Sequence, residues 1–192
     1  MIKLAVVGDI GSGKSHVAKL FGYPVFNADA EVAKLYRKSR KCYAKLKKAL
    51  PSYINSFPVK KSKLSEAIMS NENNLRKIIK IVHPEVRSIM NNFVKRNKNK
   101  KLIVLDIPLL MENKINKKKD ILIFVDAKKK EINKRLKQRT NINFKVVKKL
   151  KKLQLPVEVK KKRSDFVIKN NFRNNSVRKS VKKVIKKILI NA

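Results

Sequence analysis

Cysteine, histidine and tryptophan are scarce or missing in this chain of 192 residues. Cys42 is the only cysteine, so no internal disulfide can form. With only His16 and His83 beside it, Cys42 cannot complete a four-ligand zinc site of the usual types. Tryptophan is absent and aromatic residues make up 6%, which leaves few side chains for stacking nucleic-acid bases. A disulfide scaffold, a zinc domain and a base-stacking surface are therefore all disfavoured.

Long hydrophobic runs are also missing. No stretch approaches the roughly 20 apolar residues of a membrane helix. The short apolar run at the N-terminus leads directly into a glycine loop, not into a cleavage site, so no signal peptide is expected. Hydrophobic residues still make up 43%, enough for a packed core. We expect a cytoplasmic protein without a membrane partner.

Acidic residues are few: 13 Asp and Glu face 51 Lys and Arg, which gives a net charge of +38. Such a charge raises the hypothesis of a basic, nucleic-acid-associated protein with steeply salt-dependent binding. The lysines, however, are spread along nearly the whole chain, which is typical of a general compositional bias and not of one binding patch. We therefore expect no specific nucleic-acid partner.

Hydrophobic patterning predicts strands that alternate with helices. Strands are predicted at residues 2–7, 25–26, 102–106, 121–126 and 165–168. Helices are predicted at 14–22, 30–50, 64–68, 75–81, from Pro84 to about residue 94, within 128–163, and from about Val177 to Leu189. This alternation predicts an α/β fold whose parallel sheet is covered on both faces.

A phosphate-binding loop follows the first predicted strand. Residues 8–15, GDIGSGKS, match G-x-x-x-x-G-K-[ST] in full and lie between a strand and a helix start. In such a loop the backbone N–H groups surround phosphate oxygens, Lys14 reaches the β- and γ-phosphates, and the Ser15 hydroxyl binds Mg²⁺. The candidate ATP-binding residues are Gly11, Ser12, Gly13, Lys14, Ser15 and His16.

The loop alone does not define the reaction. A GTPase needs an N-K-x-D motif after a strand, whereas residues 116–120, NKKKD, have one residue too many and precede their strand. The length suits a small-molecule kinase better than a translocating ATPase. Asp29, after the second predicted strand, is either a helix N-cap or an acid facing the loop that takes a proton or holds the metal.

Several segments, in order, resemble the dephospho-coenzyme A kinase family along almost the whole chain. The matching segments are the loop at 8–15, Asn27–Asp29 for D-A-D, 81–87 for I-x-H-P-x-V-R, 106–112 for D-x-P-L-L-F-E, Arg135 and Arg139 for R-x-x-x-R, and Gln154 to Asn170 for Q-x-P-x-x-x-K…A-D-x-V-I-x-N. The H-P-x-V-R and P-L-L-x-E segments in this order are far more specific than the loop.

This resemblance implies ATP-dependent phosphorylation of the ribose 3′-hydroxyl of dephospho-coenzyme A, with Mg²⁺. It gives Asp29 the role of general base, Arg139 that of a cation on a lid, and Lys160 that of a second lid cation. His83, Arg87 and Leu109 join Asp29 and Lys160 as candidate substrate-binding residues, while Lys14 and Arg139 stabilise the transferring phosphoryl group. A monomer or weak oligomer is expected.

Simpler interpretations remain open for some of these residues. His83 can be a helix-start residue without a ligand, Leu109 a core residue, and Lys160 one more solvated charge. Asp106 can assist a metal or cap the turn after its strand. Asn27 replaces the first Asp of D-A-D and removes a negative charge, and Lys61 stands where the family has the Arg of I-D-R.

The expected architecture is a three-layer P-loop kinase. The core is predicted from residues 1–29, 102–127 and 164–192, a helical substrate-binding part from about 30–101, and a lid from about 138–163. A nucleoside or nucleotide kinase of the same fold is the alternative among enzymes, and a basic ATP-binding protein associated with nucleic acid is the alternative outside them.

Overall fold

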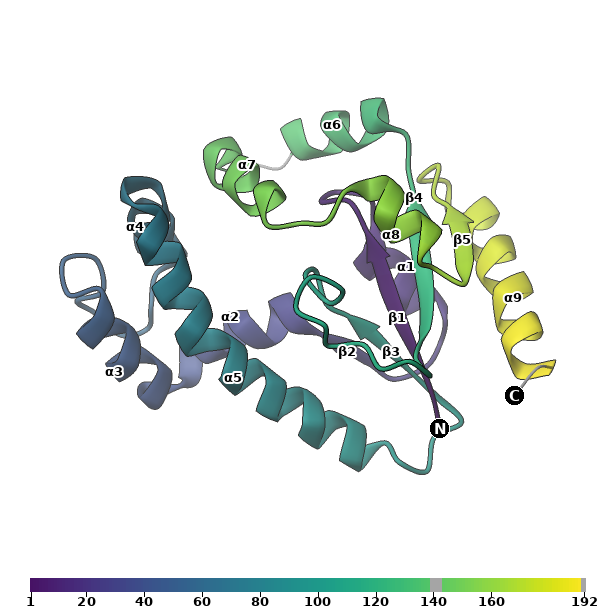
Figure 1. Cartoon of the computed structure of the whole chain (residues 1–192), viewed down its shortest axis with the longest axis horizontal. Helices are drawn as coiled ribbons and strands as arrows, with labels where there is room; N and C mark the ends of the chain where they lie inside the picture. Colours follow the sequence, from purple (N-terminus) through teal and green to yellow (C-terminus); the bar gives the residue numbers. More distant parts are fainter. Residues whose placement is uncertain (139–142, 191–192) are drawn as a thin grey trace. The chain divides into compact units, whose positions relative to one another are not determined.

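The computed structural model describes residues 1–138 and 143–190. Its strands are β1 (Ile2–Gly8), β2 (Val25–Asn27), β3 (Leu102–Asp106), β4 (Ile121–Asp126) and β5 (Phe166–Lys169). Its helices are α1 (Lys14–Leu20), α2 (Ala28–Lys38), α3 (Arg40–Ala49), α4 (Lys61–Ser70), α5 (Glu72–Arg96), α6 (Lys129–Lys137), α7 (Phe144–Lys152), α8 (Val157–Lys162) and α9 (Asn174–Ile190). Figure 1 shows these elements along the chain.

The five strands form one parallel sheet in the order β2-β3-β1-β4-β5. The central strand β1 pairs with β3 and with β4, so that Val6 lies opposite Asp106 on one side and Ile123 on the other. At the β2 edge, Asn27 pairs with Asp106. The predicted α/β fold with a parallel sheet is confirmed, and the carboxyl ends of β1, β2 and β3 meet at one edge of the sheet.

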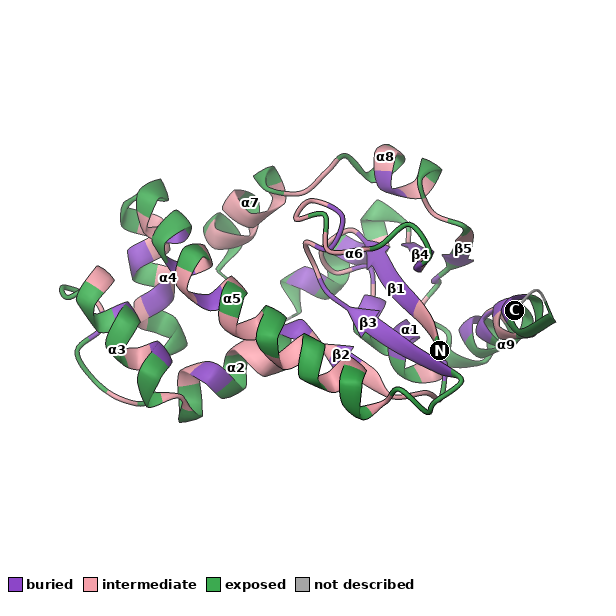
Figure 2. Ribbon diagram, turned by 60° about the horizontal axis from the view of Figure 1, so that its bottom comes forward, coloured by how far each residue is buried: buried purple, intermediate pink, exposed green. Residues whose placement is uncertain are grey.

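The sheet is held by side chains that alternate along its strands. Leu4 and Val6 of β1 point to one face, where they join a buried cluster with α1 and α9. The members that these helices contribute are Val17, Ala18, Phe21, Val177, Val181, Val184 and Ile188. Figure 2 shows β1 and β3 as almost wholly buried. Because both faces of the sheet are covered, the strand sequences are continuous apolar runs, and the strands could therefore be predicted from the sequence.

The chain divides into two compact units. Unit 1 consists of Met1–Asn27, Arg96–Ile142 and Leu150–Ala192, and it holds the whole sheet. Unit 2 consists of Ala28–Lys95 and Asn143–Lys149. It has its own apolar core, to which α2 to α5 contribute, centred on buried residues such as Cys42, Leu46 and Ala67. The division expected from the sequence, with its separate lid, stays a prediction.

One predicted helix is two. The sequence pattern predicted a single helix over residues 30–50, but α2 ends at Lys38 and α3 begins at Arg40. The residue between them, Ser39, has an extended backbone (φ −92°, ψ 102°), and its side chain accepts a hydrogen bond from the Cys42 N–H. A serine N-cap of this kind starts a new helix without disturbing the apolar spacing, so periodicity alone could not detect the break.

In α5 the structure has one helix where the sequence pattern predicted two. Two short helices, one of them starting at Pro84, were predicted where the structure has one continuous helix from Glu72 to Arg96 with Pro84 inside it. Pro84 removes one helical N–H, which normally costs about 3 kcal/mol. The apolar face of α5 nevertheless continues past the proline, since Ile78 and Val82 before it and Val86 and Ile89 after it belong to or pack on the unit 2 core. Burial of this face favours the unbroken helix.

Among the described residues, no helix is long and apolar enough to cross a membrane.

Candidate functional site

The phosphate loop is formed as the motif predicts, as the connection from β1 to α1. Gly11 and Gly13 have positive φ angles of 87° and 88°, a region that side chains with a Cβ rarely adopt. A Cβ on Gly13 would also collide with the Asn170 amide. Gly13 is the residue before α1, so the loop directs the N–H groups of the first helical turn towards its interior.

Lys14 is largely buried under the loop. Its ammonium donates to the carbonyl oxygens of Gly8 at 3.3 Å and Asp9 at 2.8 Å. The hydroxyl of Ser12 is buried and has no hydrogen-bond partner within the part of the chain that the structure describes. The loop thus combines a buried ammonium, a buried hydroxyl and a set of inward-directed backbone N–H groups. A polyphosphate would accept hydrogen bonds from all three kinds of donor.

Ser15 lies beside two polar residues at the ends of neighbouring strands. The Asn27 amide donates to the Asp106 carboxylate and lies 3.4 Å from the Ser15 hydroxyl. Asp106 is 2% exposed, so its carboxylate needs a donor of this kind. Whether it assists a metal or caps the turn after β3 stays a prediction. No cluster of three His, Cys, Asp or Glu residues that suits a metal occurs in residues 1–138 and 143–190.

Asn170, directly after β5, holds the loop from the other side. Its side-chain amide donates to the Ser12 carbonyl at 2.8 Å, and its side-chain oxygen accepts from the Phe172 N–H at 2.9 Å. Phe172 has a positive φ of 61°, and the Arg135 guanidinium lies 4.4 Å from the centre of its ring. Asn170 matched the family pattern in the sequence, but its support of the loop became visible only in the structure.

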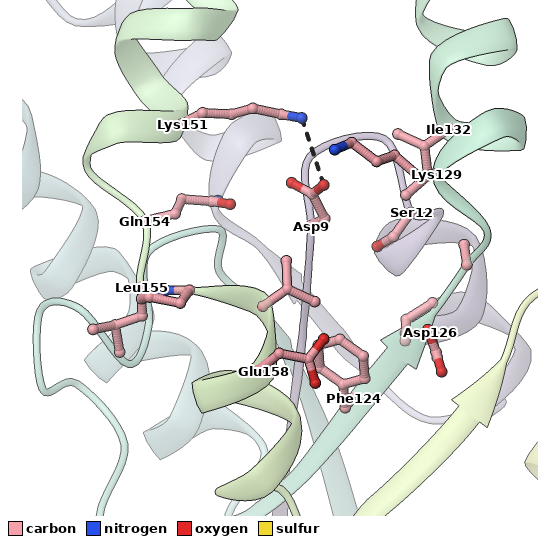
Figure 3. A pocket seen from close by; sticks show the side chains of 14 residues that line it. Asp9, Ser12, Phe124, Asp126, Lys129, Ile132, Lys151, Gln154, Leu155 and Glu158 are labelled. Atoms are coloured by element: carbon pink, nitrogen blue, oxygen red, sulfur yellow. Dashed lines mark ion pairs between the residues drawn. The ribbon is translucent and has the colours of Figure 1, made fainter.

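A cavity of about 530 Å³ lies beside the loop within unit 1. Its walls come from the loop, the end of β4, α6 and the segment around α8. The lining includes Asp9, Ser12, Asp126, Lys129, Lys151, Gln154 and Glu158, most of which Figure 3 shows turned into the space. The sheet thus has a cavity with both polar and apolar walls at the carboxyl ends of its strands, where open α/β folds bind ligands.

Lys160 is in the interior and not on an exposed lid surface. Its ammonium lies 3.1 Å from the Gln154 side-chain oxygen, 3.4 Å from Glu112 and 3.5 Å from the Gly8 carbonyl. The side chains of Lys160 and Glu112 are 2% and 9% exposed. The interpretation of Lys160 as one more solvated charge is therefore wrong. Sequence reasoning did not assign Glu112 a role, although it ends the P-L-L-x-E segment.

Glu112 and Gln154 also form hydrogen bonds between two segments of unit 1, and together with Lys160 they make a polar cluster that is called the bracket below. Glu112 accepts from the Leu155 N–H at 2.9 Å, and the Gln154 amide donates to the Pro108 carbonyl at 3.3 Å. The segment after β3 is thereby tied to the segment that enters α8. Leu109, predicted to bind substrate, is half-buried in the first of these segments, and the neighbouring Leu110 is fully buried.

Three predicted site residues belong to unit 2. Asp29 is the second residue of α2 and so is not its N-cap; it is exposed, in the first turn of a helix, where a negative charge is favourable. His83 lies within α5, so the interpretation as a helix-start residue is wrong. Burial, with a smaller contribution from the Arg87 charge, lowers the pKa of His83. Arg87 is exposed one turn further along the same helix.

The remaining predicted residues are placed as follows. Gly11, Ser12, Gly13, Lys14 and Ser15 come together in the loop, and His16 is exposed on α1. Arg139, predicted to be a catalytic cation of the lid, lies outside the described residues. The structure thus brings together the predicted phosphate-binding residues, with Lys160 next to the Gly8 carbonyl.

The sequence is similar to known proteins along most of its length. The sequence profile of the dephospho-CoA kinase family matches residues 2–176. The dephospho-CoA kinase of Wolbachia sp. subsp. Brugia malayi is 34% identical over 170 residues, which is 86% of this chain and 87% of that protein. The dephospho-CoA kinase of Bartonella quintana is also 34% identical over the same shares.

Solved structures support the fold. TT1252 from Thermus thermophilus superposes with a TM-score of 0.78 and 28% identity, over 97% of both chains. Dephospho-CoA kinase from Campylobacter jejuni has a TM-score of 0.63 at 24% identity, over 97% of this chain and 96% of that one. Shikimate kinase from Acinetobacter baumannii, with a TM-score of 0.52 and 16% identity, shares the fold alone. With this profile match, the identity to curated relatives and the formed phosphate loop, the chain belongs to the dephospho-CoA kinase family.

Proposed function

We propose that this protein transfers the γ-phosphoryl group of ATP to the 3′-hydroxyl of the ribose of dephospho-CoA, giving coenzyme A and ADP. The observation that carries the proposal is a complete phosphate loop in a chain of this family, with a buried Lys14 and a Ser12 hydroxyl that has no hydrogen-bond partner among the described residues. The substrate follows from the family, and the loop supplies the means of holding the phosphoryl donor.

The loop residues bind and orient the nucleotide. The N–H groups from Gly11 to Ser15 donate to the phosphate oxygens, and the Lys14 ammonium moves from the loop carbonyls to the β- and γ-phosphates. The backbone N–H groups and the Lys14 ammonium stabilise the negative charge on the transferring phosphoryl group. Such stabilisation is the main task of a protein in this reaction.

Mg²⁺ fits the polar group at Ser15. The Ser15 hydroxyl and the Asp106 carboxylate, joined to Asn27, would hold the ion. Bound there with the phosphates, the ion would neutralise their charge. Only one carboxylate is present among these three residues, so phosphate oxygens would have to supply much of the coordination.

Asp29 serves as the general base in this proposal. Its carboxylate accepts the proton of the attacking 3′-hydroxyl, while Arg139 adds a positive charge near the phosphoryl group. His83 and Arg87 of α5, together with Leu109, contact dephospho-CoA. The neutral imidazole that burial favours for His83 suits a hydrogen bond to the substrate more than a charge contact.

The test compares phosphoryl acceptors at fixed ATP and Mg²⁺. We expect production of coenzyme A from dephospho-CoA with a kcat/KM at least about 100-fold above that for any nucleoside or nucleoside monophosphate. Lys14→Ala is the control, and it should lose both ATP affinity and turnover, because the ammonium contacts the phosphates in both states. Preferential phosphorylation of a nucleoside or nucleotide would assign the protein to the alternative kinase class.

A further inference from the structure

The phosphate loop of this protein carries a negative charge of its own. Asp9 is the second residue of the loop, at the first of the four positions that the motif G-x-x-x-x-G-K-[ST] leaves open. One carboxylate oxygen accepts from the Ile10 N–H at 2.7 Å, which fixes the side chain to the loop. The other lies 3.5 Å from the Lys151 ammonium. A carboxylate beside a polyphosphate is repelled by it, so a compensating cation is needed.

Lys151 supplies a cation at the mouth of the loop. It lies in the last turn of α7 and lines the cavity together with Asp9, Ser12 and Lys129. Figure 3 shows the ammonium groups of Lys151 and Lys129 directed to the Asp9 side of the loop from opposite walls. The buried Ser12 hydroxyl, which has no partner within the described part of the chain, faces the same cavity.

The ion pair is poorly explained as a device for stability. The side chains of Lys151 and Asp9 are 37% and 21% exposed, and pairs exposed to this degree contribute little to folding. Its location is more informative. Asp9 holds the ammonium within a cavity that the phosphate loop also lines, where a phosphate group would become a second anionic partner.

We propose that Lys151 is a phosphate-binding residue of the nucleotide site and that Asp9 positions its ammonium there. Asp9 and the nucleotide phosphates share the cation, so the negative loop residue directs Lys151 instead of repelling the ligand. This proposal rests on the proposed function only in requiring that the loop binds ATP, and it is independent of the acceptor.

Two roles for Lys151 can be separated by a double-mutant cycle. If Lys151 binds phosphate and Asp9 positions it, Lys151→Met should weaken ATP binding about tenfold or more in the wild-type background and by a smaller but measurable factor in the Asp9→Asn background. If Lys151 only neutralises Asp9, Asp9→Asn should make Lys151→Met harmless. The matched control is Lys152→Met, because Lys152 is an exposed lysine next to it on the same helix.

The measurement is ATP binding by titration calorimetry without acceptor, at several salt concentrations. The proposal predicts weaker binding for both Lys151 variants, unchanged binding for Lys152→Met, and a shallower salt dependence when Lys151 is absent. Equal affinities of Asp9→Asn and Asp9→Asn/Lys151→Met, or of Lys151→Met and Lys152→Met, would overturn it. Failure of the wild type to phosphorylate dephospho-CoA despite binding ATP would reject the proposed function alone, while failure to bind ATP would reject both.

Discussion

Asn27 and Asp106 show how one substitution changes the chemistry of a site. The two residues are paired across β2 and β3, and the Asn27 amide donates to the buried Asp106 carboxylate. An Asp at position 27, as in the family's D-A-D segment, would put two carboxylates in contact, and one of them would be favoured in its protonated form unless a cation intervened. Asparagine avoids this repulsion and instead donates a hydrogen bond to Asp106.

Asp29→Asn tests the proposed general base. Asparagine preserves size but cannot accept the hydroxyl proton, so we expect kcat to fall by about 100-fold or more while ATP binding is retained. Steady-state kinetics and ATP titration measure the two effects separately. Glu31→Gln is a matched control, because Glu31 lies in the same first turn of α2 and pairs with Lys34. Unchanged turnover in Asp29→Asn would show that another group takes the proton.

His83 gives a prediction about pH. Its pKa is lowered below the ordinary 6.5 by burial and by Arg87, so the unfolded chain binds a proton more readily than the folded one. The free energy of unfolding should therefore fall as pH drops through the ordinary histidine range and level off below the folded-state pKa.

Urea unfolding at about pH 7.5 and about pH 5.5 measures this dependence. His83→Gln should reduce the loss of stability between the two values, whereas His16→Gln, which alters the other histidine, should leave it as in the wild type. The same loss in His83→Gln as in the wild type would refute the role of His83.

At the scale of elements, the buried bracket of Lys160, Glu112 and Gln154 ties the segment after β3 to α8. Lys160→Met leaves the Glu112 carboxylate buried without its cation, which we expect to cost about 3–5 kcal/mol in the free energy of unfolding. The double variant Glu112→Gln/Lys160→Met, which buries no charge, should cost clearly less. Chemical denaturation measures the free energy of unfolding of both variants. If Lys160→Met were as stable as the wild type, the buried ion pair between Lys160 and Glu112 would be contradicted.

The strands and the loop could be predicted because their signals are local. Each strand is a short apolar run, and the loop motif is contiguous. The break at Ser39 could not be predicted in this way, because it depends on a side-chain cap. The continuity of α5 through Pro84 could not be predicted either, because it depends on burial against the unit 2 core. The bracket was missed for a related reason: Glu112, Gln154 and Lys160 meet only after the chain has folded.

At the scale of the whole molecule, the charge of +38 is the dominant feature. Like charges repel in the compact state more than in the expanded unfolded chain, and salt screens the repulsion. We therefore expect the free energy of unfolding to rise by about 1 kcal/mol or more between about 0.05 and 0.5 M NaCl. Urea is the suitable denaturant, since it adds no ions. Stability that falls with added salt would indicate that attractive pairs outweigh the repulsion.

The two compact units contain different residues of the proposed mechanism. Unit 1 contains the sheet, the phosphate loop and the cavity, while unit 2 contains Asp29, His83 and Arg87. In the proposed mechanism unit 1 holds the phosphoryl donor at its phosphate loop, and unit 2 supplies the general base Asp29.

The position of the new phosphate tests this account most directly. The enzyme is incubated with ATP, Mg²⁺ and dephospho-CoA, and the purified product is analysed by phosphorus and proton NMR. A single new phosphomonoester on the ribose 3′-oxygen is the predicted result. A phosphate on any other atom, or ATP hydrolysis without a phosphorylated acceptor, would contradict the account.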